Sequence, residues 1–199
     1  MATAAIGRAS AEGDAFPLGW QLRAKSFLDF GVAALLLIVC APLLLLAAGL
    51  VFLSLGRPIL YRQVRVGQFG REFTMLKFRT MRESDDGNEF CPAELGVDEG
   101  PGGIEGTDRR SRVGRWLRRT SLDELPQLWN VLRGQMSLVG PRPERPEYVS
   151  FFAHQVFDYP ARHRLKTGIT GLAQVSGLYG STSISERAAC DNAYIDITG

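Results

Sequence analysis

Residues 118–144, around which the rest of the chain is predicted to be organised, read RRTSLDELPQLWNVLRGQMSLVGPRPE. Apolar residues recur in it at the i, i+3, i+4, i+7 spacing of one helix face, at Leu125, Leu128, Trp129 and Leu132. Ser121 is a residue type that favours a helix start, and Gly134 is one that favours a helix stop. The stretch therefore predicts a helix between these two residues.

Two adjacent carboxylates, Asp123 and Glu124, fall at the start of this helix. Pro126 limits where the helix begins, because an interior proline loses a backbone hydrogen bond. A start at Ser121, with Ser121 and Glu124 as a capping box, competes with a start at Asp123, which suits the proline better. Either start puts both carboxylates in the first turn, where the helix dipole favours an ionised, nucleophilic Asp123 and free amides accept phosphate oxygens. Helix capping alone is the competing interpretation.

A hydrophobic segment precedes this stretch. Residues 31–55 contain no charged residue, and as a helix they would extend roughly 37 Å, enough for a bilayer core of about 30 Å. Pro42 lies near the middle, where a proline can kink the helix back. Basic residues flank both ends, which places both on the cytoplasmic face under the positive-inside rule. We therefore predict a re-entrant membrane helix over residues 23–57, broken at Pro42, after a loose tail over 1–22; a straight span is the alternative.

Two strand-like runs, residues 59–66 and 71–79, flank the turn-like GQFG and predict a β-hairpin. The second run ends in KFRTM, in which Lys77 and Arg79 share one face of an extended strand. Their two cations are therefore expected to converge on a phosphate or pyrophosphate. A solvated basic face, or contact with anionic lipid, is the alternative.

Charge changes sign along the middle of the chain. Residues 83–108 are acidic and Gly-rich with no Lys or Arg, which predicts a flexible loop. Six arginines then crowd residues 109–119 and are expected to face the membrane or pair with the acidic loop. Further on, two prolines flank Arg142 and would hold it as a fork for a phosphate or carboxylate; a structural Arg–Glu turn is the alternative.

The remaining features mostly exclude functions. The chain has 199 residues and a formal net charge of +2, which suits one domain with a membrane element and gives no case for nucleic acid. Its three cysteines are widely spaced, so neither a disulfide framework nor a zinc site is indicated. Residues 166–177, KTGITGLAQVSG, have glycines suited to tight turns and close backbone approach. Arg162, Arg164 and Lys166 before them are expected to extend a basic surface.

Three blocks occur in order after the hydrophobic segment: KFRTM at 77–81, SLDELPQLWNVLRGQMSLVGPRPE at 121–144 and GITGLAQV at 168–175. Over about residues 25–195 the chain thereby resembles the bacterial sugar transferase domain, the catalytic unit of the monotopic phosphoglycosyl transferases. The resemblance implies a mixed α/β fold with an N-terminal re-entrant helix-break-helix, a β-hairpin and several amphipathic helices. It places residues 58–199 as a catalytic domain on the cytoplasmic face of a bacterial inner membrane.

The resemblance also implies a chemistry: transfer of a sugar 1-phosphate from a UDP-sugar to polyprenyl phosphate, the first step of surface glycoconjugate synthesis. Asp123 would be the nucleophile, through an aspartyl-phosphosugar, and Glu124 would bind Mg²⁺. Arg118 would hold the lipid phosphate and Arg142 the nucleotide diphosphate, while Lys77 and Arg79 would contact a phosphate of the substrate. Membrane lipid and a second copy of the chain are the other partners considered.

The chain departs from the family pattern at several positions. A proline usual near Arg109 is absent, Ala41 stands where serine is common, and Thr167 and Leu172 stand where proline and tryptophan are frequent. The chain also ends at Gly199, before the further C-terminal helix that family members usually have, so truncation or a smaller domain is expected. Two other functions stay open: a catalytically impaired membrane scaffold, and a membrane-bound nucleotide-sugar hydrolase with water as the acceptor.

Overall fold

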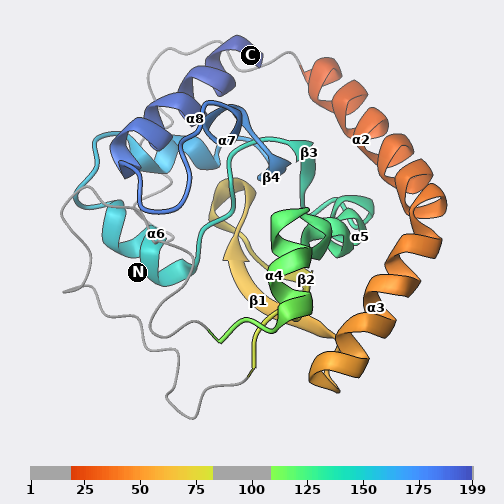
Figure 1. Ribbon diagram of the computed structural model, residues 1–199. Helices are drawn as coiled ribbons and strands as arrows, with labels where there is room; N and C mark the ends of the chain where they lie inside the picture. Colours follow the sequence, from red (N-terminus) through yellow and green to blue (C-terminus); the bar gives the residue numbers. More distant parts are fainter. Residues whose placement is uncertain (1–18, 83–108, 199) are drawn as a thin grey trace.

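The computed structural model describes residues 19–82 and 109–198. The expected loop over residues 83–108 and most of the expected tail lie outside these ranges. The described part is mixed α/β, as expected, with two small two-stranded sheets among short helices. Figure 1 shows the two long N-terminal helices, α2 and α3, as a bent arc along one side of the molecule. The two sheets and the shorter helices lie inside this arc.

The hydrophobic segment is broken where the sequence predicts a break. Helix α2 spans Gly19–Val39 and α3 spans Ala41–Leu55, with a bend of 63° between them. Pro42 is the second residue of α3 and has no N–H to donate back to Ile38, so the helix is weakened at the bend. Within the described chain neither helix by itself has the length and apolarity needed to cross a membrane, whereas the bent pair taken together has both.

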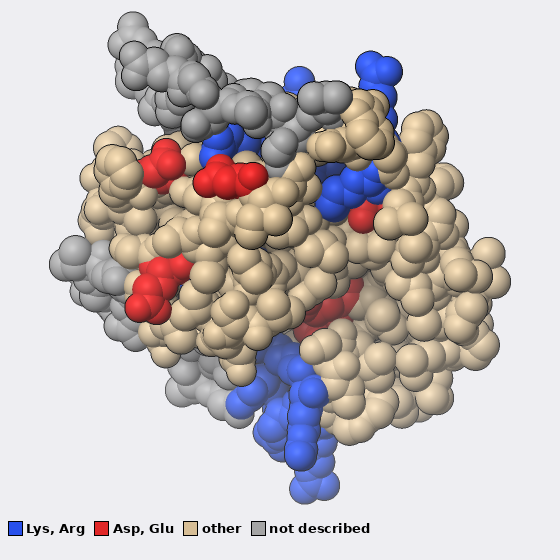
Figure 2. Space-filling model, turned by 90° about the horizontal axis from the view of Figure 1, so that it is seen from above, with Lys and Arg blue, Asp and Glu red and all other residues tan. Residues whose placement is uncertain are grey.

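Helices α2 and α3 bury small apolar residues against the domain and expose large apolar residues on their other faces. Ala33, Ala47 and Val51 are buried against the domain. Large apolar side chains remain exposed on the other faces of the two helices: Phe27, Leu28, Leu35, Ile38, Val39, Leu45, Leu46 and Leu53. The right-hand side of Figure 2, where the two helices lie in Figure 1, is almost entirely free of charge. An apolar surface of this extent on a monomer marks an interaction surface.

A polar contact fixes α2 to the domain. The buried carboxylate of Asp29 accepts hydrogen bonds from the Ser137 hydroxyl at 2.8 Å and from the Leu138 amide at 3.2 Å. Lys25 pairs with the same carboxylate at 3.2 Å and donates to the Val139 carbonyl at 3.0 Å. Strand β3, Ser137–Val139, is therefore tied to the first half of α2.

The predicted hairpin is confirmed. Strand β1, Leu60–Val66, pairs antiparallel with β2, Glu72–Phe78, in a register from Leu60 opposite Phe78 to Val66 opposite Glu72. The turn between them, η1 (Gln68–Gly70), holds Phe69 in the left-handed region at φ 56°. Because side chains alternate along a strand, Lys77 lies on one face of β2 while Leu76 and Phe78 lie on the other.

Two glycines of residues 166–177, Gly168 and Gly171, serve close backbone approach, as expected. Strand β4, Gly168–Thr170, runs parallel to β3 and leads into the short helix α7, Leu172–Val175. A Cβ on Gly168 would lie 2.2 Å from the Gly140 nitrogen, and one on Gly171 would lie 2.2 Å from the Gly140 oxygen. A larger residue at either position would therefore push the two backbones apart.

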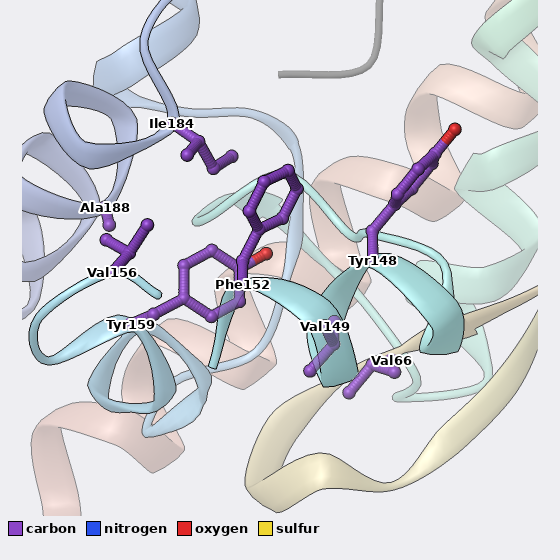
Figure 3. Packing of buried hydrophobic residues seen from close by; sticks show 8 residues of the cluster. All are labelled: Val66, Tyr148, Val149, Phe152, Val156, Tyr159, Ile184 and Ala188. Carbon is purple, nitrogen blue, oxygen red and sulfur yellow. The ribbon is translucent and has the colours of Figure 1, made fainter. Parts of the chain in front are cut away.

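The C-terminal elements form their own core. Helix α6 (Pro146–Phe152), the turn η4 (Tyr159–His163) and helix α8 (Ile184–Thr198) meet around Phe152, Tyr159 and Ile184, each 0% exposed. Figure 3 shows the Phe152 ring among residues of all three elements, with Val66 at the end of β1 nearby. Full burial of each of these side chains is worth about 1.5–3 kcal/mol, so α8 is an integral part of the domain.

Candidate active site

The two carboxylates lie in a 3-10 helix, not in the first turn of an α-helix. This segment, η3, spans Leu122–Gln127, and α5, Leu128–Leu132, follows it directly. Both acids lie in the first turn of a helix, as predicted, but that helix is η3 and not the α-helix that carries the apolar spacing. The capping box is wrong, because Ser121 adopts φ 56° and its side chain makes no cap bond. Pro126 is accommodated because the α-helix begins only after it.

Helix α5 is held by both apolar and polar contacts. Leu128 is buried with Val131 against the hairpin, while Trp129 is 47% exposed instead of joining that face. Asn130, which the sequence analysis did not single out, is fully buried and bonds the Thr74 carbonyl at 2.8 Å and the Leu76 amide at 3.1 Å. In the sequence, an amide side chain inside an apolar helical run indicates a buried group that needs hydrogen-bond partners. Together these contacts fix α5, and with it η3, along the edge of β2.

One carboxylate oxygen of Glu124 pairs with two cations. Its Oε1 lies 2.7 Å from the Lys77 Nζ and 3.2 Å from an Arg142 guanidinium nitrogen. Burial acts to raise the Glu124 pKa, but Arg142 and Lys77 outweigh it and hold this pKa below its usual range. Burial and the nearby Arg142 lower the Lys77 pKa, although Glu124 opposes them. Among residues 19–82 and 109–198, both of these contacts fall on Oε1, and the second Glu124 oxygen has no ion pair or hydrogen bond.

Asp123 is 6% exposed, and its environment differs from that of its neighbour. Burial raises the Asp123 pKa and the Glu124 charge adds to this, while Lys77 and Arg118 act in the opposite direction. The helix dipole favours the ionised form of Asp123, as the sequence analysis argued, whereas removal from water opposes ionisation and is the largest effect on the Asp123 pKa. Asp123 is thus a desolvated carboxyl close to two cations.

The structure separates the remaining predicted cations. Arg118, in the last turn of α4 (Arg112–Arg119), donates to the Thr80 hydroxyl at 3.0 Å and is close enough to lower the Asp123 pKa. Arg79 is largely buried and donates to the Leu55 carbonyl at the end of α3, where the helix dipole favours a cation. Direct contact therefore joins Lys77, and not Arg79, to Glu124.

The backbone of Arg142 is supported from behind by a buried ion pair. Its carbonyl accepts from Arg162 at 3.2 Å, and Arg162 is paired with Asp191 of α8 at 2.5 and 3.0 Å. Arg162 also donates to the Tyr159 hydroxyl at 2.9 Å. The expectation that Arg162 extends a basic surface is wrong, because it is 1% exposed. The Arg142 side chain keeps 38% of its surface exposed, so a ligand can reach it.

The structural Arg–Glu turn, the alternative to a binding role for Arg142, does not form between Arg142 and Glu144. Glu144 is buried and pairs with Arg65 of β1 at 3.7 Å, while its carbonyl accepts from the Val66 amide at 2.9 Å. Arg142 points to Glu124 instead. The loop is therefore fastened to the hairpin by Glu144, which leaves Arg142 directed at the carboxylate pair.

The acidic groups fit a magnesium ion that has few protein ligands. No cluster of three or more His, Cys, Asp or Glu suited to a metal occurs in residues 19–82 and 109–198. Asp123 and Glu124 are two adjacent carboxylates, and Mg²⁺ is commonly held by one or two carboxylates together with substrate phosphates and water. The donor set is therefore compatible with a magnesium ion that arrives with a phosphate substrate.

Comparison with known proteins identifies the family. The bacterial sugar transferase family matches residues 20–198. The chain belongs to this family. A protein of Caulobacter vibrioides named UDP-glucose:undecaprenyl-phosphate glucose-1-phosphate transferase is 46% identical over 175 residues, 86% of this chain and 62% of that protein.

Two further relatives match a similar share of this chain but differ in how much of their own length is matched. Undecaprenyl-phosphate glucose phosphotransferase of Komagataeibacter xylinus is 39% identical over 89% of this chain and 32% of its own length. Exopolysaccharide production protein ExoY of Sinorhizobium fredii is 40% identical over 90% of this chain and 79% of its own length. The chain thus spans less than two thirds of the first two relatives and most of the third.

Proposed function

We propose that this chain transfers a sugar 1-phosphate from a UDP-sugar to polyprenyl phosphate, as the first step of exopolysaccharide or related glycan synthesis. The observation that carries the proposal is the buried Asp123, which is influenced by Lys77 and Arg118 and adjoins Glu124, the partner of Lys77 and Arg142. The names of the relatives supply the substrate classes, and UDP-glucose is the donor to test first.

In the first step an Asp123 carboxylate oxygen attacks the sugar-bearing phosphorus of the UDP-sugar. A phosphorus–oxygen bond to Asp123 forms, the bond between the two phosphates breaks, and UMP leaves. Phosphoryl transfer depends mainly on positioning and charge neutralisation. Arg142 and Lys77, which already hold Glu124, orient the diphosphate and neutralise its charge.

In the second step a phosphate oxygen of the lipid attacks the same phosphorus. The bond to Asp123 breaks, which restores the carboxylate and gives a polyprenyl diphosphate sugar. Arg118, which donates to Thr80 and is close enough to lower the Asp123 pKa, is the residue proposed to hold the lipid phosphate. A magnesium ion bound at Glu124 and Asp123 would neutralise charge on the diphosphate.

The bent helix pair is proposed to enter and leave the membrane on the cytoplasmic face. Its exposed apolar side chains and its 63° bend support this placement. The tie between Asp29 and β3 would then hold the catalytic domain against the membrane surface.

Product analysis tests the proposal against its alternatives. Purified protein is incubated with UDP-glucose and magnesium, with and without undecaprenyl phosphate. A lipid-linked sugar diphosphate that requires the lipid supports the transferase. Free sugar phosphate formed equally without lipid indicates a hydrolase, and no turnover with any UDP-sugar indicates a scaffold.

A further inference from the structure

A cleft of about 870 Å³ lies between the bent helix pair and the hairpin. Leu37 and Leu44, on the two sides of the bend, line it together with Leu60 and Leu76 of the hairpin and Trp129 of α5. Its volume falls in the range of about 300–1,000 Å³ typical of ligand pockets. The proposed transfer reaction leaves this cleft unassigned.

The cleft and the carboxylate cluster lie on different faces of the hairpin. Leu60, Arg62, Leu76 and Phe78 line the cleft, and the register pairs Leu60 with Phe78 and Arg62 with Leu76. They share one face, since directly paired residues point the same way. Lys77, which binds Glu124, lies on the other face.

The lining changes from apolar to cationic toward solvent. Phe78 is buried within the cleft, whereas Arg62 and Arg133 are exposed. Within residues 19–82 and 109–198, no acceptor group contacts either guanidinium. The guanidinium of Arg133 lies 5.4 Å from the centre of the Trp129 ring, which limits its orientation. Two unpaired guanidiniums therefore line an apolar cavity.

We propose that this cleft binds a phospholipid, with an acyl chain in its apolar part and the lipid phosphate between Arg62 and Arg133. Guanidinium groups match phosphate oxygens in geometry and charge. Basic pockets beside membrane helices bind anionic head groups in the same manner. The adjoining α2 and α3 already expose the apolar surface that would lie among lipid chains.

The lipid acceptor has the same general chemistry, a phosphate on a long apolar chain. It must bring its phosphate to Asp123, which lies beside the cations on the other side of the hairpin. Arg62 lies on the hairpin face opposite to Lys77, so a phosphate held at Arg62 lies on the other face from that cluster. The occupant is therefore a phospholipid that does not react, and its binding does not depend on the proposed transfer.

Native mass spectrometry of the purified full chain in mild detergent, titrated with phosphatidylglycerol, tests this site. Replacing both Arg62 and Arg133 with Ala should weaken binding roughly tenfold or more, because two charge-assisted contacts are lost. Arg71→Ala is the matched control: Arg71 is exposed on the same hairpin but does not line the cleft, and binding should not change. Ala48→Trp should weaken binding with both arginines intact by filling the apolar part.

Three results would overturn the proposal. Unchanged phosphatidylglycerol binding in the double variant would exclude the arginines as the phosphate site. Equally tight binding of diacylglycerol would show that no phosphate is recognised. Displacement of phosphatidylglycerol by an equal concentration of undecaprenyl phosphate, with the same dependence on the two arginines, would assign the cleft to the acceptor. Loss of transferase activity with binding retained would bear on the proposed function alone.

Discussion

Asp123 and Glu124 are neighbours in sequence with opposite environments. Glu124 is paired directly with Lys77 and Arg142 and has a lowered pKa, while Asp123 is desolvated and has a raised pKa. A desolvated carboxylate is the more reactive nucleophile, and a paired carboxylate is suited to a fixed supporting role. The geometry therefore favours Asp123, and not Glu124, as the residue that attacks phosphorus.

Asp123→Asn should abolish both turnover and the trapped phosphosugar adduct, because an amide cannot form the aspartyl phosphate. The thermal stability of this variant, unlike its activity, should not fall. Since the folded-state pKa is raised, the ionised carboxylate destabilises the fold once the pH exceeds both the unfolded and the folded pKa values. At pH 7 the variant should melt at the same or a higher temperature than the native chain, and this difference should shrink as the pH falls toward 4.

Thermal melts over that pH range, with adduct detection by mass spectrometry, measure both effects. An adduct in Asp123→Asn would remove the nucleophile assignment. A melting temperature well below that of the native chain at pH 7 would show that the Asp123 carboxylate is structural.

Arg142 and Arg118 should affect different halves of the reaction. Arg142→Ala should mainly slow release of UMP from UDP-sugar, while Arg118→Ala should mainly slow transfer from Asp123 to the lipid, each by roughly 10²-fold or more. Single-turnover assays, with and without lipid, separate the two steps. Equal losses in both steps for both variants would contradict this division.

At the scale of elements, the sequence predicted what depends on local pattern. Alternation and the GQFG turn located the hairpin, and Pro42 located the break near Cys40. The sequence did not show that Arg79 would cap α3 or that burial would dominate at Asp123, because both depend on how separate elements pack. Asp191 carried a readable signal: it shares the apolar spacing of Ile184, Ala188 and Ile195 on α8, so a buried acid was to be expected there.

Asp191→Asn tests whether α8 supports the site through Arg162. Leaving the buried Arg162 without its anionic partner should cost about 3–5 kcal/mol of unfolding free energy. It should also weaken UDP-sugar use, because Arg162 bonds the Arg142 carbonyl. Asp196→Asn is the matched control on the same helix: its pair with Arg164 is exposed and should contribute about 0–1 kcal/mol.

Denaturant unfolding and donor KM measure these two effects. A surviving variant with an unchanged KM for UDP-glucose would show that the buried pair stabilises the fold without positioning Arg142. Equal destabilisation by Asp191→Asn and Asp196→Asn would contradict the assigned burial.

At the scale of the whole molecule, the proposed re-entrant placement of the bent helix pair would keep both of its ends, and the domain, on the cytoplasmic side of the membrane. Trp20 at the start of α2 and Phe69 at the hairpin tip are both exposed and lie on opposite sides of the apolar segment in sequence. In a background without native cysteines, Cys at either position should react with a membrane-impermeant reagent only when the cytoplasmic face is accessible. A straight span would give labelling from opposite faces.

Replacing Pro42 with Leu should change this pattern. The substitution restores the N–H that proline lacks and removes the ring clash, so a continuous helix becomes more favourable. Basic residues at both ends oppose moving either end across the membrane. We therefore expect partial labelling of position 20 from the outer face, with position 69 still cytoplasmic. Unchanged labelling would show that the Asp29 contacts with β3, and not the proline, hold the bend.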